Sequence, residues 1–269
     1  MAETFIREDV APYFQGDPVG CAWAMEGAVV RAVAGRQTLR VELGGGTYYL
    51  KRHRGVGWAE ILKNWLVGKQ PILGAGNEYQ ACRHLERLGL AAPRVAAFAE
   101  SGGFPGTRSS FVLCDALVDY DDLEMLTLRW LDQDVDPLEK RALVMRVADF
   151  ARRFHQAGLV HRDFYLCHLL RHRNPAVEPL AVLDLHRALI FDAVPDRWRE
   201  RDLAALLFSS FDLPLSRLSW LRFVRVYTGR PLRETFVREG AFWRKVYRRA
   251  LRLYEKGTRK GLTLGRFTP

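Results

Sequence analysis

The segment GLVHRDFYLCHLL, residues 158–170, sets a polar triplet, His161-Arg162-Asp163, between two apolar stretches. It follows a predicted amphipathic helix that opens with an Asp-Pro pair and ends at Gly158. An aspartate in the turn after a helix often does no more than bond the local backbone. The triplet alone therefore does not separate a functional loop from an ordinary turn.

Protein kinases open their catalytic loop with His-Arg-Asp and place an Asn after four further residues. In this chain the Asn position holds His168. Phosphoryl transfer needs a cation at the nucleotide phosphates, a carboxylate for Mg²⁺ and a carboxylate that orients the acceptor hydroxyl. Kinases supply these groups in a fixed chain order, so the order of the other parts tests the triplet.

Three further residues fall in that order. Lys51 ends the third predicted strand, Glu78 lies in the first turn of a predicted helix, and Asp184 ends a short strand 21 residues after Asp163. Each has an ordinary explanation by itself: a solvated lysine, an acid favoured by the helix dipole, and a strand-end turn residue. Their common order and element types predict a kinase-like fold.

The elements divide the chain into a strand-rich part and a helix-rich part. Short strands are predicted at 29–33, 38–43 and 47–51, separated by glycines that can take positive φ. We therefore predict an α+β, bilobal protein-kinase-like fold. The N-lobe spans residues 1–117 and binds nucleotide phosphates, and the C-lobe spans 118–269 with the catalytic loop, the metal site and basic helices.

The net charge of +10 is concentrated near the C-terminus. Residues 197–269 hold 18 Lys/Arg against 6 Asp/Glu, whereas the first 196 residues hold 23 against 25. Such an excess suggests an acidic partner, namely phosphates, an acidic sugar, an anionic membrane or an acidic protein. A solvated basic surface is the alternative. No nucleic-acid-binding motif is visible, so we expect no nucleic acid.

The chain carries no apolar run of the 20 or so residues that span a bilayer and no secretory signal pattern at its start. Its four cysteines lie far apart without a Cys-x-x-Cys pair. A disulfide scaffold and a zinc site are therefore poor interpretations, and we expect the reducing cytoplasm.

The pattern resembles the lipopolysaccharide core heptose(I) kinases of Gram-negative bacteria, a branch of the protein-kinase-like superfamily. The resemblance rests on NEYQACRHLERLGL, GLVHRDFYLCHLL, VLDLHRA and RERDLAALLFSS. These sugar kinases are similar in carrying His at the position of His168. The resemblance implies ATP and Mg²⁺ as cofactors. It also implies, as acceptor, a heptose hydroxyl of the lipopolysaccharide inner core, at the cytoplasmic face of the inner membrane.

The resemblance also implies residue roles. Asp163 is the catalytic base, Asp184 the principal Mg²⁺ ligand, and Lys51 the phosphate-binding cation with Glu78 as its partner. His168 is a candidate metal ligand, although Mg²⁺ prefers oxygen. Alternatively, His168 contacts a phosphate or holds Asp163 or Asp184 in place.

Other nucleotide contacts are less regular. The phosphate loop has a single glycine, so Gly35 and Arg36 are the candidate phosphate contacts in VAGRQ. The segment LCDAL, residues 113–117, is the candidate hinge, with Asp115 and Leu117 facing adenine through their backbone.

Departures from protein kinases favour a small-substrate enzyme without an activation loop. Leu185-His186 replaces the Phe-Gly after the metal-binding aspartate, and only 18 residues separate Asp184 from Asp202, the expected anchor of the next helix. Another core sugar (Kdo), a protein hydroxyl, or a catalytically silent scaffold remain alternatives to heptose.

Two amphipathic segments could face a membrane or pack in the core. One is the predicted helix around Trp58 and Trp65, and the other is AFWRKVYRRALRLYEK, residues 241–256. The second pairs an apolar stripe with six Lys/Arg residues. It could lie on an anionic membrane, or pack its stripe inward and leave a wet basic face.

Overall fold

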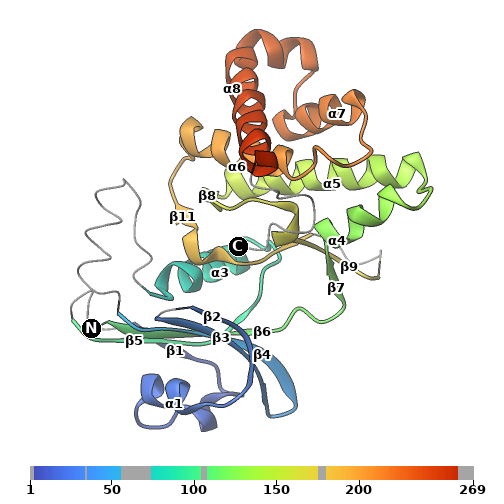
Figure 1. Ribbon diagram of the computed structural model, residues 1–269. Helices are drawn as coiled ribbons and strands as arrows, with labels where there is room; N and C mark the ends of the chain where they lie inside the picture. The colour runs from blue at the N-terminus through green and yellow to red at the C-terminus, as the bar shows by residue number, and fades with distance from the viewer. Residues whose placement is uncertain (1–2, 34, 56–73, 104–107, 175–179, 260–269) are drawn as a thin grey trace. The chain divides into compact units, whose positions relative to one another are not determined.

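The computed structural model describes residues 3–33, 35–55, 74–103, 108–174 and 180–259. The chain divides into two compact units. Unit 1 consists of Met1–Val118 together with Asp184–Arg187, and unit 2 of Asp119–Leu183 together with Ala188–Pro269. Unit 1 holds the large sheet and unit 2 most of the helices (Figure 1), which confirms the predicted α+β class.

Unit 1 is built on a six-stranded antiparallel sheet with the order β1-β5-β6-β4-β3-β2. The predicted meander is present as β2, β3 and β4. Gly44 and Gly45 join β3 to β4 with φ of +56° and +81°, which glycine adopts without steric cost in a two-residue hairpin. The strands are β1 (Thr4–Ile6), β2 (Ala28–Val33), β3 (Arg36–Leu43), β4 (Gly46–His53), β5 (Val95–Ser101) and β6 (Ser109–Asp115).

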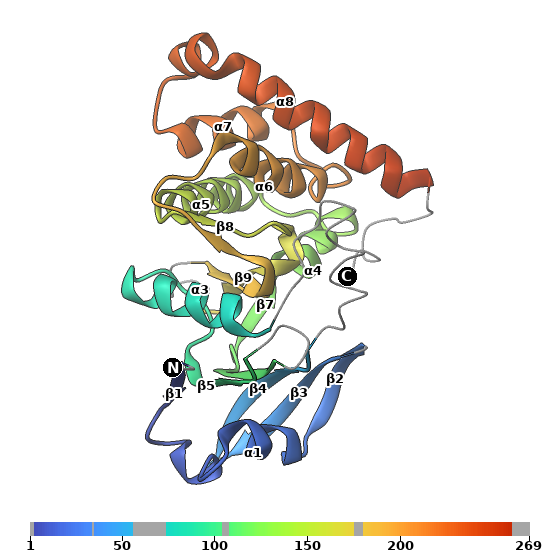
Figure 2. The same cartoon turned by 90° about the vertical axis from the view of Figure 1, so that its left-hand side faces the viewer.

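Two helices cover opposite faces of this sheet, α1 (Pro18–Ala24) on one and α3 (Gly76–Arg87) on the other (Figures 1 and 2). Leu50 of β4 is fully buried in the apolar cluster on the α1 face. Because side chains alternate along a strand, the next residue, Lys51, points to the α3 face. The core packing of β4 thus directs Lys51 toward the helix that carries Glu78.

Unit 2 is organised around α5 (Pro137–Gln156). The side chain of Asp136 accepts the N–H of Leu138 at 2.8 Å, and Pro137 stands in the first turn, as the Asp-Pro pair predicted. The helix packs against α7, and α6 packs against α8 (Figure 2). The other helices of the unit are α4 (Leu123–Leu128), α6 (Asp196–Phe208), α7 (Arg217–Thr228), α8 (Leu232–Arg259), η2 (Arg129–Leu131) and η3 (Leu166–His168).

Short strands surround the catalytic-loop triplet in unit 2. One three-stranded sheet has the order β10-β9-β7, and a separate pair joins β11 to β8. The strands are β7 (Tyr120–Asp122), β8 (Leu159–Val160), β9 (Leu169–His172), β10 (Ala181–Val182) and β11 (Leu189–Ile190). The triplet therefore begins directly after β8 and is followed by η3 and β9. Two further short helices, η1 (Ala11–Tyr13) and η4 (Leu185–Arg187), belong to unit 1.

The predicted basic amphipathic segment is part of α8. Its apolar residues Trp243, Val246 and Ala250 are buried, and the helix packs along α6. The stripe is therefore used inside unit 2 and is not available for insertion into a membrane, while basic residues between its members are exposed. The helix predicted around Trp58 and Trp65 lies outside the described residues.

No helix in the described ranges is both long and apolar enough to cross a membrane. All four cysteines are free thiols: Cys82 and Cys114 are buried, and Cys21 and Cys167 are partly buried. The two buried thiols, Cys82 and Cys114, contribute to packing.

Gly158 allows the chain to pass from α5 into β8 and the catalytic loop. Its φ is +81°, and an added Cβ would lie 2.1 Å from the carbonyl oxygen of Phe191. Gly229, after α7 in the same unit, also has positive φ (+65°), but its Cβ would meet only a side-chain atom, at 3.5 Å.

We predict that Gly158→Ala lowers the free energy of unfolding by about 2–5 kcal/mol, because backbone strain and a backbone clash add. Gly229→Ala, the matched control, should cost only the strain, about 1–2 kcal/mol. Urea unfolding of both variants measures the difference. Equal losses of unfolding free energy in the two variants would show that the close approach to Phe191 adds no destabilisation.

Candidate active site

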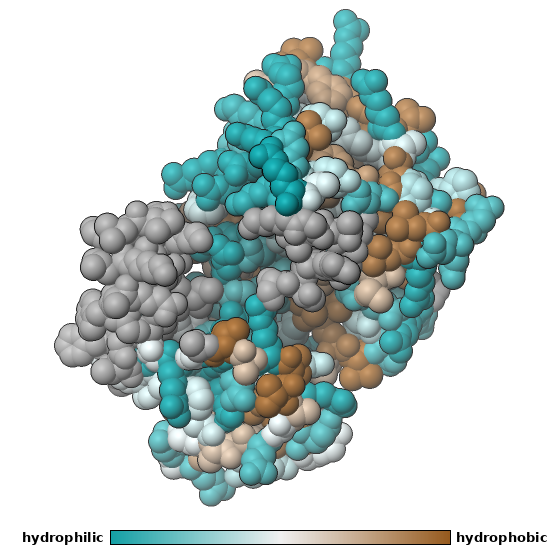
Figure 3. All heavy atoms as spheres, in the orientation of Figure 1, coloured by the Kyte–Doolittle hydropathy of each residue, from teal (hydrophilic) through white to brown (hydrophobic). Residues whose placement is uncertain are grey.

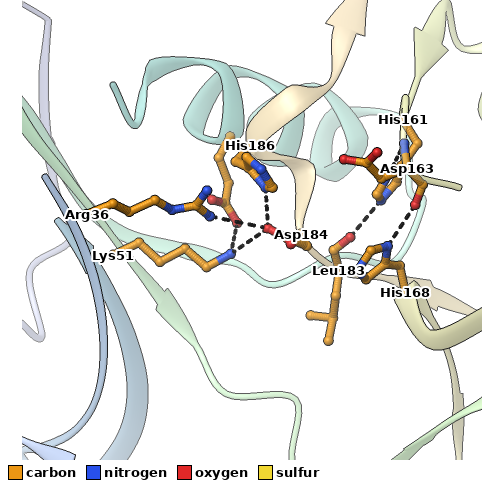
Figure 4. Close-up of polar contacts among 9 residues, drawn as sticks. Arg36, Lys51, His161, Asp163, His168, Leu183, Asp184 and His186 are labelled. Carbon is orange, nitrogen blue, oxygen red and sulfur yellow. Dashed lines mark hydrogen bonds and ion pairs between the residues drawn. The ribbon is translucent and has the colours of Figure 1, made fainter. Parts of the chain in front are cut away.

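Lys51 lies between two carboxylates in unit 1. Its Nζ is 2.6 Å from Glu78 Oε1 and 3.4 Å from Asp184 Oδ1 (Figure 4). Arg36 Nη2 lies 3.6 Å from the same Asp184 oxygen. Residues from β3, β4, α3 and the turn just before η4 thus form one charged cluster, which brings together four of the predicted site residues.

The charges in this cluster stabilise one another. Burial lowers the pKa of Lys51, but the carboxylates of Glu78 and Asp184 outweigh it and hold the pKa above its ordinary value. Lys51 is therefore a permanent cation. Glu78 is 4% exposed and its Oε2 has no hydrogen-bond partner among the described residues. Removing Lys51 would leave a buried carboxylate uncompensated, which costs about 3–5 kcal/mol.

In unit 2 the catalytic loop is fixed by Asp202 of α6. Its carboxylate, 1% exposed, accepts the backbone N–H groups of His161 at 2.6 Å and Arg162 at 2.8 Å. Arg162 has φ of +73°, a strained conformation for a non-glycine residue. Two charge-assisted hydrogen bonds to one buried carboxylate offset that strain and set the direction in which the chain continues to Asp163.

The ring of His161 holds two backbone segments at once. Its Nε2 lies 2.8 Å from the carbonyl oxygen of Leu183, and its Nδ1 accepts the N–H of Asp163 at 3.3 Å. A carbonyl can only accept, so the proton is on Nε2 and the neutral ring satisfies both contacts. The N–H of Leu183 donates to the carbonyl of His168 at 2.9 Å. The residue that precedes Asp184 is thereby tied to the catalytic loop.

His168 contacts the backbone of Asp163, as Figure 4 shows. Its Nδ1 donates to the Asp163 carbonyl oxygen at 2.7 Å, and its ring stacks on that of His161 at 5.2 Å. The proton on Nδ1 leaves Nε2 of the neutral ring as an acceptor. Holding Asp163, one of the predicted roles of His168, thus has a hydrogen bond in unit 2.

The sequence of the chain matches the family described as "Lipopolysaccharide kinase (Kdo/WaaP) family" over residues 21–227. The chain belongs to this family. Its members are kinases, so the chain is a phosphotransferase.

Individual relatives agree with the family match. A protein of Pseudomonas aeruginosa named "Lipopolysaccharide core heptose(I) kinase WaaP" is 44% identical over 249 residues, which are 91% of this chain and 93% of the relative. A protein of the same name from Escherichia coli K12 is 38% identical, with 96% and 99% covered. A solved structure described as "WaaP in complex with acyl carrier protein" matches with a TM-score of 0.81 at 38% identity, over 94% of this chain and 99% of that one. The kinase-like fold and the resemblance are confirmed.

The remaining predicted nucleotide residues differ in what they contact. Gly35 takes φ of +72°, and its carbonyl accepts the N–H of Arg54 at 2.8 Å. The side chain of Asp115 is bound by Arg7 at 2.8 and 2.9 Å. The N–H of Leu117 makes no hydrogen bond within the described part of the chain, although its neighbours at 115, 116 and 118 all do.

Asp184 and His168 are the predicted metal ligands. The described residues contain no group of three or more His, Cys, Asp or Glu side chains arranged to hold a metal ion. Mg²⁺ in kinases is held by one or two carboxylates together with substrate phosphates, so the carboxylate of Asp184 fits that pattern. Asp184 was predicted to lie in the C-lobe, residues 118–269. It packs with unit 1 because Lys51 and Arg36 attract its charge.

Two histidines near Asp184 had no predicted role. Nδ1 of His186 hydrogen-bonds Asp184 Oδ1, and its place two residues after the aspartate was the only signal in the sequence. His53, at the end of β4, is 5% exposed, and its Nε2 has no partner among the described residues. Burial, and then the charges of Arg36, His186 and Lys51, lower the pKa of His53 to about 3.

His53 predicts a pH dependence of stability. The folded protein binds the proton at His53 only near pH 3, whereas the unfolded chain binds it near pH 6.5. The unfolded state is therefore favoured as pH falls through this window, and stability above it is unaffected. Between pH 7 and pH 5 the titration of His53 should lower the free energy of unfolding by about 2 kcal/mol.

We expect His53→Leu to lack this part of the acid loss. Urea unfolding of wild type and variant at pH 7 and pH 5 measures it. From pH 7 to pH 5 the free energy of unfolding of the wild type should fall by about 2 kcal/mol more than that of the variant. Parallel losses in both proteins would show that His53 is protonated in the folded state.

Proposed function

We propose that this chain transfers the γ-phosphate of ATP to a heptose hydroxyl of the lipopolysaccharide inner core. The proposal rests chiefly on the ion pairs of Lys51 with Glu78 and Asp184 in a member of this family. The ordered His-Arg-Asp loop also supports it. The relatives at 38% and 44% identity are named heptose(I) kinases, which supports heptose over Kdo or a protein hydroxyl.

Asp163 is the proposed base. Its main chain is held from both sides, since its N–H is bonded by the ring of His161 and its carbonyl by the ring of His168. The carboxylate orients the acceptor hydroxyl and takes its proton as the new O–P bond forms and the bond to the ADP oxygen breaks. His168 acts in this proposal by positioning Asp163.

The nucleotide is bound through unit 1. Lys51 and Arg36, which balance the charge of Asp184, move to or share the phosphate oxygens when ATP binds, and Gly35 lets the backbone approach. The unbonded N–H of Leu117 is the proposed donor to adenine. Asp115 has its side chain committed to Arg7, so it can contribute to the base only through its carbonyl.

Asp184 is the proposed Mg²⁺ ligand, with Nε2 of His168 as a second candidate. The bound metal would neutralise the charge of the β- and γ-phosphates. Two cations, Arg36 and Lys51, lie beside Asp184 and favour its charged carboxylate. Lys51 competes little with the metal for Asp184 Oδ1, because its contact to Glu78 is shorter, at 2.6 Å against 3.4 Å.

The kinase proposal predicts that Asp163→Asn retains the fold and ATP binding and lowers turnover by a factor of ~10²–10⁴. Mass spectrometry of dephosphorylated core oligosaccharide, incubated with Mg·ATP, measures one added phosphate. Asp134→Asn, an exposed carboxylate in the same unit, is the control and should leave turnover unchanged. Near-wild-type turnover in Asp163→Asn would remove Asp163 from the mechanism, and a wild type that never phosphorylates the acceptor would overturn the function.

A second candidate function is the binding of an acyl carrier protein. The solved relative is described as a complex with one, which is an acidic partner. Unit 2 contains a cavity of about 780 Å³ lined mostly by apolar side chains of α4, α5, α6 and α7, including Leu143, Val147, Leu206 and Trp220. A cavity of this size and character suits a fatty-acyl chain. The exposed basic residues of α8 suit an acidic surface.

The exposed residues Arg244, Lys245 and Arg248 test this surface. Arg249 is left intact because its Nε is 2.7 Å from Glu200 and it holds α8 to α6. Changing the three to Glu should abolish salt-sensitive binding of acyl carrier protein and leave ATP binding intact. The same variant in a flotation assay with anionic liposomes tests the alternative, which is association with the cytoplasmic face of the inner membrane. Unchanged binding to both acyl carrier protein and liposomes would show that the basic face of α8 is a solvated surface that binds neither.

A further inference from the structure

Three arginines converge on one tryptophan at the start of α6. The guanidinium carbons of Arg162, Arg197 and Arg201 lie 5.4, 5.8 and 4.6 Å from the ring centroid of Trp198. We call these four residues the Trp198 cluster. Figure 3 shows hydrophilic side chains over the part of unit 2 that α6 and α8 form. The cluster belongs entirely to unit 2.

The cluster lies beside the proposed base. Asp202, which follows Arg201 in α6, accepts the backbone N–H of Arg162, and Arg162 directly precedes Asp163. The first two turns of α6 and the catalytic loop are therefore joined by a short hydrogen bond of 2.8 Å. The cluster therefore includes the residue of the catalytic loop that directly precedes the proposed base.

The charges of the cluster are unfavourable for the protein alone. Arg197 and Arg201 are four residues apart on one helix face, where like charges repel, and they stand at the positive end of the helix dipole. Neither forms an ion pair with a carboxylate in the ranges that the structure describes. Their neighbours do: Arg199 is paired with Asp196 at 2.9 Å, and Glu200 with Arg249 at 2.7 Å. Repulsion of this kind is tolerated where a bound anion offsets it.

A solvated basic surface would not require this geometry. Exposed arginines spread into water, whereas Arg197 and Arg201 are directed to one ring, which leaves their planar N–H edges available to donate to a ligand. Guanidinium groups in such an arrangement recognise planar carboxylates and phosphates through paired hydrogen bonds.

We propose that the Trp198 cluster binds an anionic group of the acceptor, a sugar carboxylate or a phosphate ester next to the hydroxyl that is phosphorylated. This inference rests on the proposed kinase function and assigns the residues that select its substrate. Trp198 holds the guanidinium groups in place, and Arg197 and Arg201 bind the anion. The enzyme is therefore specific for an acidic saccharide, and a neutral one of the same shape binds poorly.

The test is the double variant Arg197→Gln/Arg201→Gln in the full chain. The KM for core oligosaccharide that lacks phosphate only at the accepting hydroxyl and keeps its other acidic groups should rise about 10- to 100-fold, which is ~1.4–2.7 kcal/mol. The KM for ATP and the kcat at saturating acceptor should change less than about threefold. Arg225→Gln, an exposed arginine of α7 without an ion pair among the described residues, is the matched control and should change neither constant.

The acceptor is then altered to identify the anion. Esterifying its carboxylates, in material already freed of phosphate esters, should raise the KM of the wild type to that of the double variant and leave the variant unaffected. If removal of phosphate esters has the same effect and esterification has none, the recognised group is a phosphate. Restoring charge as Arg197→Lys/Arg201→Lys should recover part of the loss, because Lys keeps the charge without the paired donors.

Calorimetric titration of the same oligosaccharide without ATP separates this inference from the proposed function. A wild type that binds acceptor but transfers no phosphate would overturn the kinase proposal alone. Equal Kd values for wild type and double variant would overturn the role of the cluster, whether or not phosphate is transferred. A variant whose ATP and acceptor constants deteriorate together would also overturn it, because that result indicates a general loss of structure.

Discussion

The buried carboxylate of Asp202 is the constraint on which the catalytic loop depends. It accepts two consecutive backbone N–H groups, and Nε2 of His155 lies 3.4 Å away. A carboxylate that is 1% exposed survives burial only with such partners. The requirement works in both directions. The loop satisfies the charge, and the charge holds Arg162 at a positive φ that the loop would otherwise abandon.

Once that turn is fixed, the orientation of the loop follows from two histidine rings. His161 and His168 stack on each other and bond the N–H and the carbonyl of Asp163 respectively. Neither ring needs a charge to do so, and a protonated His161 would lose its acceptor for the Asp163 N–H. The imidazole in place of the usual Asn thus supports the backbone of Asp163.

Much of the fold could be predicted from sequence because its signals are local. The meander followed from β-branched runs and glycines, and α5 from its Asp-Pro start, both of which depend on neighbouring residues. The pairing of Lys51 with Glu78 followed from chain order. In contrast, the contact of Arg36 with Asp184 spans about 150 residues and depends on how the sheet presents β3. The burial of His53, whose strand pattern gives no sign of its environment, was equally inaccessible.

The same limit applies to the basic charge. The sequence located the excess in the last quarter of the chain but could not divide it into functional parts. The structure shows that Arg199 and Arg249 neutralise carboxylates between helices, so they serve packing. The exposed residues of α8 form a face that needs no particular geometry to attract an acidic partner. Arg197 and Arg201 differ from both groups because an aromatic ring fixes their directions beside the catalytic loop. Charged side chains that are held in fixed orientations at an energetic cost indicate recognition of a defined anion. Charged side chains that move freely indicate only long-range attraction.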